Sequence, residues 1–309
     1  MKEIETYFYS GFLDAGKTTY IQDNLFHDFF YRRGTTLILS FEEGEVSYDL
    51  AGLKERRCEV SFYDDSGDIA SFCRREADRF KPDRIIIEDN VMIDNLPESL
   101  PDTFVLKAKT ALISGETLPV YYDNMRPYFT RILQDAKLVV FNRTADKEDL
   151  LPYSTPFRLI NPRASYLWES PMGYHEKAFG IPLTYDKSRN ELTISDADYA
   201  CFYLDSLEHP IDYQGKAIEL TVQIQDPSAE PQGYVFGGRK VFTCCFADIQ
   251  TLGFYLMDEA NSAFEPYGWY RIRAIAGTEM IFNQKRLCLK VQQTEPIAAP
   301  KQELIGFRR

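Results

Sequence analysis

The stretch "TYFYSGFLDAGKTTYIQDNL", residues 6–25, decides the fold of the first half of the chain. Aromatic and β-branched residues typical of a strand run into a glycine-bounded loop, and a helical pattern begins where the loop ends. The loop, Gly11 to Thr18, fits the pattern G-x-x-x-x-G-K-[ST] without a mismatch. In that pattern backbone N–H groups curl around phosphate oxygens, and the following helix adds the positive end of its dipole. The sequence therefore predicts a phosphate-binding loop, with a plain glycine turn as the alternative.

The loop is expected to bind a nucleoside triphosphate, GTP or ATP, together with Mg²⁺. The residues expected to contact the nucleotide are Gly11, Asp14, Ala15, Gly16, Lys17, Thr18 and Thr19. Lys17 is the first candidate catalytic residue, because a lysine at this place reaches the β and γ phosphates. The hydroxyl of Thr18 is the first candidate ligand of Mg²⁺.

The composition is that of a soluble globular protein of two domains, with 309 residues, 44% of them hydrophobic and 27% charged. A formal charge of -12 without a basic block argues against binding to a nucleic acid. The start "MKEIETYFYS" lacks the features of a secretory signal, and no apolar run approaches the ~20 residues that cross a bilayer. We therefore expect no membrane insertion and a cytoplasmic location.

The order of apolar runs predicts two kinds of domain. Up to about residue 165, short apolar runs alternate with helical stretches, which is typical of an α/β fold with a mainly parallel sheet. From "ELTIS" onward, short alternating runs bounded by turn residues predict a small β-rich barrel or sandwich, with room for a helix near "DIQTLGFYLMDEA". We expect a P-loop nucleotide-binding domain over 1–165, a connector over 166–195 and the β-rich domain over 196–309.

Two acidic features follow the loop. Glu88 ends the apolar strand of "DRIIIEDN", and a carboxylate there could hold Mg²⁺ through water or polarise the attacking water, although many strands simply end in an acidic residue. Beside the loop the functional interpretation is preferred, which makes Glu88 both a catalytic and a metal candidate. In "FEEGEVSYD", Glu42, Glu45 and Asp49 could bind Mg²⁺ or a second metal, and a solvated acidic loop is the alternative.

Together these residues resemble the CobW-type branch of metal-handling P-loop GTPases, relatives of the urease and hydrogenase maturation GTPases. The segment "GFLDAGKTT" is close to the loop of that branch, "EEGEVSYD" resembles its acidic segment, and "IIIED" resembles its Glu-ended strand. "VVFNRTAD" stands where its guanine reader belongs, so the resemblance implies that Asn142 contacts the base. It further implies a nucleotide-dependent metal chaperone or insertase, with Zn²⁺ or another transition metal as cargo.

The chain departs from that family at four places. Phe41 replaces the Asn that opens the acidic segment, and Val91 replaces the switch glycine of Glu-x-x-Gly. Asp146 lies one position late for the guanine reader, which leaves the choice of base open. Fourth, Cys58 and Cys73 stand too far apart for the family's Cys-x-Cys-Cys motif, the close spacing that Zn²⁺ selects.

The second half carries a different resemblance. The run from "DYQGKAIELTVQIQDP" to "GWYRIRAIAG" resembles the C-terminal domain of a bacterial family of unknown function associated with a two-part permease. The residues that carry this likeness are the arginine before the Cys-Cys-x-x-Asp segment, Gly253, Trp269 and Gly277. Cys244 and Cys245, followed by Asp248, are adjacent and would point to opposite faces of a strand, so burial is preferred to a metal or redox role.

Three functional hypotheses remain. The first is a Mg²⁺-dependent NTPase, using GTP by preference, that couples hydrolysis to handling a metal or loading a metalloprotein. The second is a hydrolysis-impaired adaptor that grips nucleotide and docks on a permease subunit or another protein partner, a hypothesis favoured by Val91 because a switch glycine approaches the γ-phosphate closely. A kinase ranks last, because no acceptor site is visible. Analogy to the resembled class suggests a homodimer.

Overall fold

The chain forms two compact units in the computed structural model. The structure describes residues 3–27, 34–44, 46–65, 67–144, 148–170, 173–177, 179–226, 233–242, 249–257, 264–281 and 284–305. Unit 1 comprises Met1–Lys147 and Ile160–Ala178, and unit 2 comprises Glu148–Leu159 and Phe179–Arg309. The three-part division at residues 165 and 195 stays a prediction.

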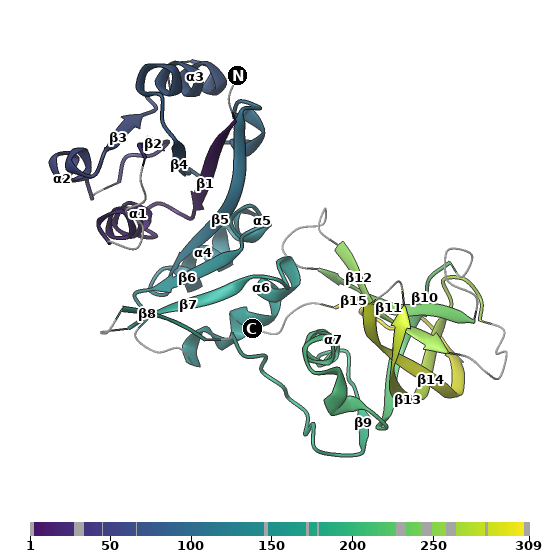
Figure 1. The fold of residues 1–309 in the computed structure, drawn as a ribbon. Helices are drawn as coiled ribbons and strands as arrows, with labels where there is room; N and C mark the ends of the chain where they lie inside the picture. Colours follow the sequence, from purple (N-terminus) through teal and green to yellow (C-terminus); the bar gives the residue numbers. More distant parts are fainter. Residues whose placement is uncertain are drawn as a thin grey trace. The chain divides into compact units, whose positions relative to one another are not determined.

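Unit 1 is built on an eight-stranded sheet in the order β3-β2-β4-β1-β5-β6-β7-β8 (Figure 1). Neighbouring strands are parallel throughout, except for the last pair, β7 and β8. The strands are β1 Ile4–Ser10, β2 Thr36–Ser40, β3 Cys58–Phe62, β4 Arg84–Glu88, β5 Phe104–Ser114, β6 Leu138–Asn142, β7 Ser165–Ser170 and β8 Gly173–Glu176. All five residues of β2 are buried, as expected for a central strand covered on both faces. The mainly parallel α/β fold is confirmed.

Helices cover both faces of this sheet. They are α1 Lys17–Phe26, α2 Leu50–Glu55, α3 Ile69–Phe80, α4 Leu118–Asn124 and α5 Arg126–Leu133, with a 3-10 turn, η1, at Pro97–Ser99. Ile21 and Leu25 of α1 pack with Tyr7 and Tyr9 on one face, whereas Phe72 of α3 packs with Phe8 on the other. Successive residues of β1 therefore belong to different cores, as the alternation of a strand requires.

Unit 2 contains a closed five-stranded barrel. Its strands are β10 Ala217–Ile224, β11 Tyr234–Phe242, β12 Ile249–Met257, β14 Gln284–Ile297 and β13 Trp269–Ile281, and β9 Glu191–Thr193 and β15 Leu304–Ile305 add at the sides. The ring closes because β10 pairs with both β11 and β13. Within the ring, β12 and β14 are parallel and the other pairs are antiparallel. The expected β-rich domain is therefore confirmed, and it is a barrel.

The helix considered near "DIQTLGFYLMDEA" is wrong, because Ile249–Met257 form strand β12. Every second residue, Leu252, Phe254 and Leu256, points into the barrel core, and this period of two is that of a strand. The remaining helical elements are η2 Glu148–Tyr153, α6 Ser154–Ile160, α7 Tyr199–Glu208 and η3 Pro210–Tyr213. Among the described residues, no helix combines the length and the apolar character needed to cross a membrane.

Candidate nucleotide-binding site

Polar side chains end five parallel strands of unit 1 at the same edge of the sheet. They are Ser10 of β1, Ser40 of β2, Glu88 of β4, Ser114 of β5 and Asn142 of β6. All five are buried, although each follows an apolar strand. The carboxyl ends of parallel strands are where open α/β sheets bind ligands.

The glycine-bounded loop joins β1 to α1 at this edge. Gly16 precedes α1 with φ +83°, and a Cβ there would lie 2.6 Å from Nδ2 of Asn142. That Nδ2 donates to the carbonyl of Ala15 at 2.7 Å, and the Arg143 guanidinium donates to the carbonyl of Asp14 at 2.7 Å. The end of β6 therefore holds the loop in place. The buried Oδ1 of Asn142 has no hydrogen-bond partner within the part of the chain that the structure describes.

Lys17 is buried and folded back on its own loop. Its ammonium donates to the carbonyls of Gly11 and Phe12, both at 2.8 Å, and forms an ion pair with Glu42 at 2.6 Å. Burial raises the pKa of Glu42 to about 7, although the neighbouring Lys17 ammonium lowers it. A phosphate that binds Lys17 must therefore replace a carboxylate that already occupies one of its donors.

Glu88 is the centre of a hydrogen-bond network at the same edge. Its Oε1 accepts from the Thr18 hydroxyl at 2.6 Å, and its Oε2 accepts from the Ser40 hydroxyl at 2.7 Å and the Tyr48 hydroxyl at 2.9 Å. The next residue, Asp89, is also buried and accepts from the Ser10 hydroxyl at 2.5 Å. Burial, followed by the charge of Glu88, raises the pKa of Tyr48, so this hydroxyl stays a donor at neutral pH.

A cavity of about 220 Å³ opens beside this network, lined among others by Thr18, Ser40, Glu42 and Glu88. A hydroxyl and a carboxylate facing one small space are hard oxygen ligands, the kind that Mg²⁺ prefers. Thr18 and Glu88 therefore fit Mg²⁺ in the kind of ligand atom that they offer. Among the three metal candidates, Thr18 and Glu88 are in direct contact, whereas Glu42 contacts the lysine.

The acidic segment does not form a carboxylate cluster in the described residues. Asp49 caps α2, because its side chain accepts from the Gly52 N–H at 3.0 Å. Glu45 lies outside the described residues. In the ranges that the structure describes, no group of three or more His, Cys, Asp or Glu side chains could hold a metal ion. The alternative of an acidic loop therefore agrees better with the placement of Asp49.

Cys58 and Cys73 are buried on opposite faces of the sheet. Cys58 packs in the core that contains α1, and Cys73 packs in the core that contains α3. Burial raises the pKa of both thiols, that of Cys73 to about 12. Two thiols separated by the sheet cannot share an ion.

The departures from the resembled family have structural counterparts. Phe41 is buried against Tyr63 and Phe72, so the position of the family's Asn is filled by a core residue. Val91 is buried, and its carbonyl accepts from Arg131 at 3.5 Å. Asp146 lies outside the described residues.

Thr19, a candidate contact to the nucleotide, is exposed on α1.

Sequence reasoning missed Ser10, Ser40, Tyr48 and Arg143. A usable signal exists for the two serines, since each ends an apolar strand as Glu88 does. Tyr48 and Arg143 carry no such signal, because their contacts depend on how loops fold back over the sheet.

The pairing of Glu42 with Lys17 predicts that nucleotide affinity without Mg²⁺ depends on pH. A carboxyl with a pKa of about 7 is mostly protonated at pH 6 and mostly ionised at pH 8, and only the ionised form competes with phosphate for Lys17. Affinity for GDP in EDTA should therefore fall as pH rises from 6 to 8, by up to about tenfold. Calorimetric titration at both pH values measures this.

The matched variant is Glu42→Gln, which cannot ionise. At pH 8 it should bind Mg²⁺-free GDP more tightly than the wild type does, by up to about tenfold, and at pH 6 the two proteins should bind about equally. The phosphates' own titration is common to both proteins at any one pH. Equal pH dependence in the two proteins would contradict the competition. Weaker binding of the variant only when Mg²⁺ is present would instead support Glu42 as a metal ligand.

In unit 2, the residues that carry the second resemblance hold the barrel together. Arg239 is fully buried, lies over the Trp269 ring at 5.0 Å, and donates to the Asp196 carboxylate and the Gln302 carbonyl. Gly253 lies beneath Phe236, since a Cβ there would be 2.8 Å from its ring. Nothing in the structure explains Gly277. Cys244, Cys245 and Asp248 lie outside the described residues.

Two comparisons with known proteins found a similarity, and a third found none. A crystal structure of the hydrogenase maturation factor HypB from Archaeoglobus fulgidus is similar with a TM-score of 0.37 and 16% identity, over 54% of this chain and 80% of that one. Nothing among the curated proteins matches the chain. Residues 175–305 match the family model of the DUF1980 C-terminal domain. This match confirms the expected resemblance of the second half to a domain of unknown function, and the barrel of unit 2 is the part of the chain that carries it.

Proposed function

We propose that unit 1 is a Mg²⁺-dependent P-loop NTPase that prefers GTP and works as a metal chaperone or insertase of the CobW type. The observation that carries the proposal is the contact of Thr18 with Glu88 at the mouth of the glycine-bounded loop. It joins the loop to the end of a neighbouring parallel strand, beside a cavity of about 220 Å³. This is the placement that P-loop enzymes use for phosphate, metal and attacking water.

The residues divide the work as follows. Lys17 turns from Glu42 to the β and γ phosphates, and the loop N–H groups from Gly11 onward bind phosphate oxygens. The Thr18 hydroxyl donates to Glu88, and its oxygen would be a ligand of Mg²⁺. Mg²⁺, when bound, neutralises charge that develops on the phosphates. Glu88 orients or polarises the water that attacks the γ-phosphorus.

The acidic segment is suited to a switch. It reaches the phosphate end of the site through two contacts, Glu42 with Lys17 and Tyr48 with Glu88. Both contacts involve groups that rearrange when a γ-phosphate arrives or leaves. Segments held in this way are ordered in one nucleotide state and released in the other.

Asn142 is the candidate contact to the base. Asn142 has an unpartnered Oδ1 that could accept from a base, but its Nδ2 already holds the loop at Ala15. Zn²⁺ or another transition metal would be cargo, delivered to a metalloprotein partner.

The second candidate function is a nucleotide-binding adaptor with impaired hydrolysis, whose barrel docks on a permease subunit or another protein. One observation favours it: Arg131 of α5 binds the carbonyl of Val91 and pairs with Asp94 at 2.6 Å. These two contacts restrain the segment after Glu88, whereas a switch segment must be able to move.

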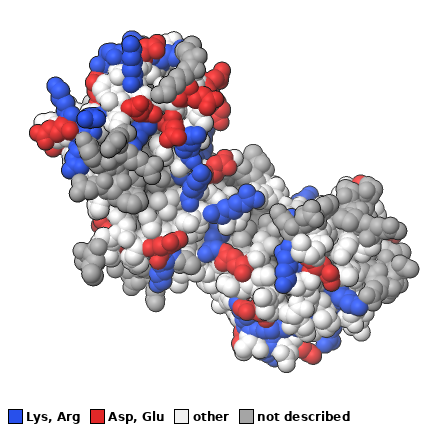
Figure 2. Space-filling view, viewed as in Figure 1, with Lys and Arg blue, Asp and Glu red and all other residues white. Residues whose placement is uncertain are grey.

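A homodimer is proposed by analogy alone. No nucleic-acid partner is proposed, since described charges of both signs are interspersed on the face drawn in Figure 2.

The test is calorimetric titration of the purified chain with Mg²⁺-GTP, Mg²⁺-ATP and Mg²⁺-GDP, followed by a phosphate-release assay with and without Zn²⁺. Guanine-selective binding with release of phosphate supports the NTPase. Tight binding without turnover supports the adaptor and contradicts the NTPase. Absence of binding to all three nucleotides contradicts both.

A further inference from the structure

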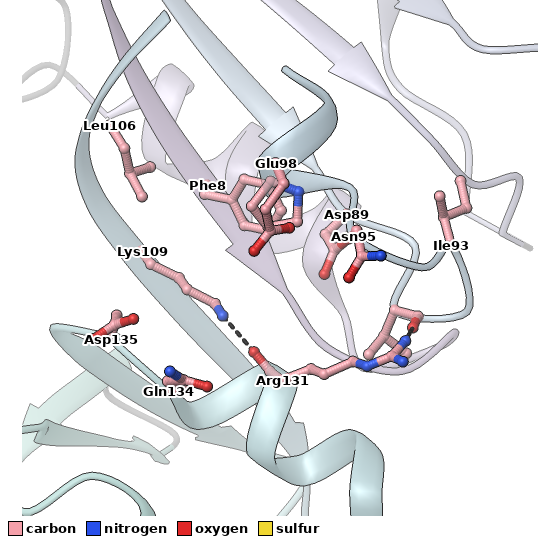
Figure 3. Close-up of a pocket in the computed structure, with 12 residues that line it drawn as sticks. Phe8, Asp89, Ile93, Asn95, Glu98, Leu106, Lys109, Arg131, Gln134 and Asp135 are labelled. Carbon is pink, nitrogen blue, oxygen red and sulfur yellow. Dashed lines mark hydrogen bonds between the residues drawn. The ribbon is translucent and has the colours of Figure 1, made fainter. Parts of the chain in front are cut away.

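Unit 1 contains a second cavity, of about 200 Å³ (Figure 3). Phe8 belongs to its wall and to the core on the α3 side, so the cavity lies on the face of the sheet opposite α1. It is bounded by β5, the end of α5 and the segment after β4. Neither the phosphate-binding loop nor the acidic segment contributes to its lining.

Lys109 of β5 points into this cavity. A register shift in the pairing of β1 with β5 places Leu106 and Lys109 on the same side, and Lys109 is the neighbour of Phe8. Its ammonium donates to the Arg131 carbonyl and lies 5.9 Å from the centre of the Phe8 ring. No described carboxylate lies within ion-pair distance of it, and burial lowers its pKa.

Asp89 supplies a buried carboxylate to the same cavity. It is 5% exposed and accepts one hydrogen bond, from Ser10. Burial raises its pKa, while the charges of Lys17, Lys109 and Arg131 lower it. The cavity therefore holds an ammonium and a carboxylate that face a common space and do not pair with each other (Figure 3).

The rest of the lining sets the size and polarity of a ligand. Ile93 and Leu106 add apolar wall beside Phe8, and the exposed Glu98 and Asp135 add two further carboxylates at the rim. A volume of about 200 Å³ is below the 300–1,000 Å³ typical of sites for drug-sized molecules. The lining suits a small molecule with one anionic group, one cationic group and a short apolar part.

We propose that this cavity binds a small zwitterion of the α-amino acid class, with its carboxylate on Lys109 and its ammonium on Asp89 and Glu98. A ligand bound in this cavity would affect the nucleotide site through residues that are neighbours in the chain. Asp89 follows Glu88 directly, and its hydrogen-bond donor Ser10 directly precedes Gly11 of the loop. The binding itself does not depend on the proposed NTPase activity.

The experiment is calorimetric titration of the nucleotide-free chain with each of the common amino acids, and with acetate and methylamine as single-charge probes. At least one amino acid should bind at millimolar concentration or below, and the single-charge probes should bind at least about tenfold more weakly, because each lacks one charged contact. Lys109→Met should weaken amino acid binding about tenfold or more. Lys107→Met, at an exposed position on the same strand outside the cavity, should leave it unchanged.

Three results would overturn the proposal: no amino acid binds, Lys109→Met binds as tightly as the wild type, or acetate or methylamine binds as tightly as the best amino acid. If Lys109→Met does not fold, Leu106→Trp replaces it, since this half-exposed rim position can hold a ring that fills the cavity and should abolish binding. Because the assay contains no nucleotide, failure of the NTPase proposal would leave its result unaffected.

Discussion

Replacing Lys17 with methionine should lower the affinity for Mg²⁺-GTP and Mg²⁺-GDP by more than about 100-fold, because several charge-assisted contacts to phosphate are lost together. Lys17 is buried, and its ammonium contacts the carbonyls of Gly11 and Phe12 and the carboxylate of Glu42. Methionine keeps most of the length of the side chain and removes the ammonium with its charge and donors. Calorimetric titration of both proteins measures the effect.

The control for this prediction concerns Glu42, which loses its partner in the variant. A buried carboxylate without its ammonium destabilises the folded state, so weaker binding could reflect a damaged loop. The double variant Lys17→Met with Glu42→Gln removes the unpaired charge and should unfold near the wild-type temperature while still failing to bind. Binding within a few-fold of the wild type in the double variant would show that the loop does not grip phosphate through Lys17.

The phosphate-binding loop and its sheet could be predicted from the sequence because both depend on local signals. The loop motif fixes the order of strand, turn and helix within about twenty residues, and β1, the loop and α1 lie where the motif requires. The parallel sheet could be predicted because its strands are buried on both faces and so read as apolar runs. Contact between Thr18 and Glu88 then follows from two adjacent parallel strands.

The electrostatic partners could not be predicted in the same way. Glu42 was a metal candidate from its charge and position, yet in the structure it pairs with Lys17. Asp49 has the same charge and the same short segment, but it begins a helix and caps it. Spacing in the sequence does not distinguish these roles, because each depends on which donor the folded segment reaches.

The remaining features could not be predicted because they depend on how the whole sheet is assembled. Cys58 and Cys73 are separated by fourteen residues in the chain, but the sheet that passes between them was not visible from their spacing. The cavity around Lys109 and Asp89 was equally hidden, since it depends on a register shift in the pairing of β1 with β5. In β12, by contrast, apolar residues do alternate along the sequence. A helix was still considered, because a mainly apolar run of this length suits both a strand and a helix.

Glu88→Gln should separate binding from hydrolysis. Glutamine keeps the shape of the side chain and an oxygen that can accept from up to two of the three hydroxyls that Glu88 binds, but it carries no charge with which to orient or polarise water. Phosphate release from Mg²⁺-GTP should therefore fall about 100-fold or more, within the range for loss of a catalytic acid–base or electrostatic group. Affinity for Mg²⁺-GDP should change only a few-fold, because the loop and Lys17 are untouched.

Tyr48→Phe provides the matched comparison, since it removes one hydrogen bond to Glu88 and leaves the carboxylate. If Glu88 acts on water, this variant should slow release only a few-fold, as loss of one neutral donor to a carboxylate should. If Glu88 instead serves only to hold the acidic segment through Tyr48, the two variants should slow release to the same extent, and the catalytic role is refuted. Single-turnover phosphate release, measured for both variants beside the wild type at saturating Mg²⁺-GTP, distinguishes the two outcomes without interference from product dissociation.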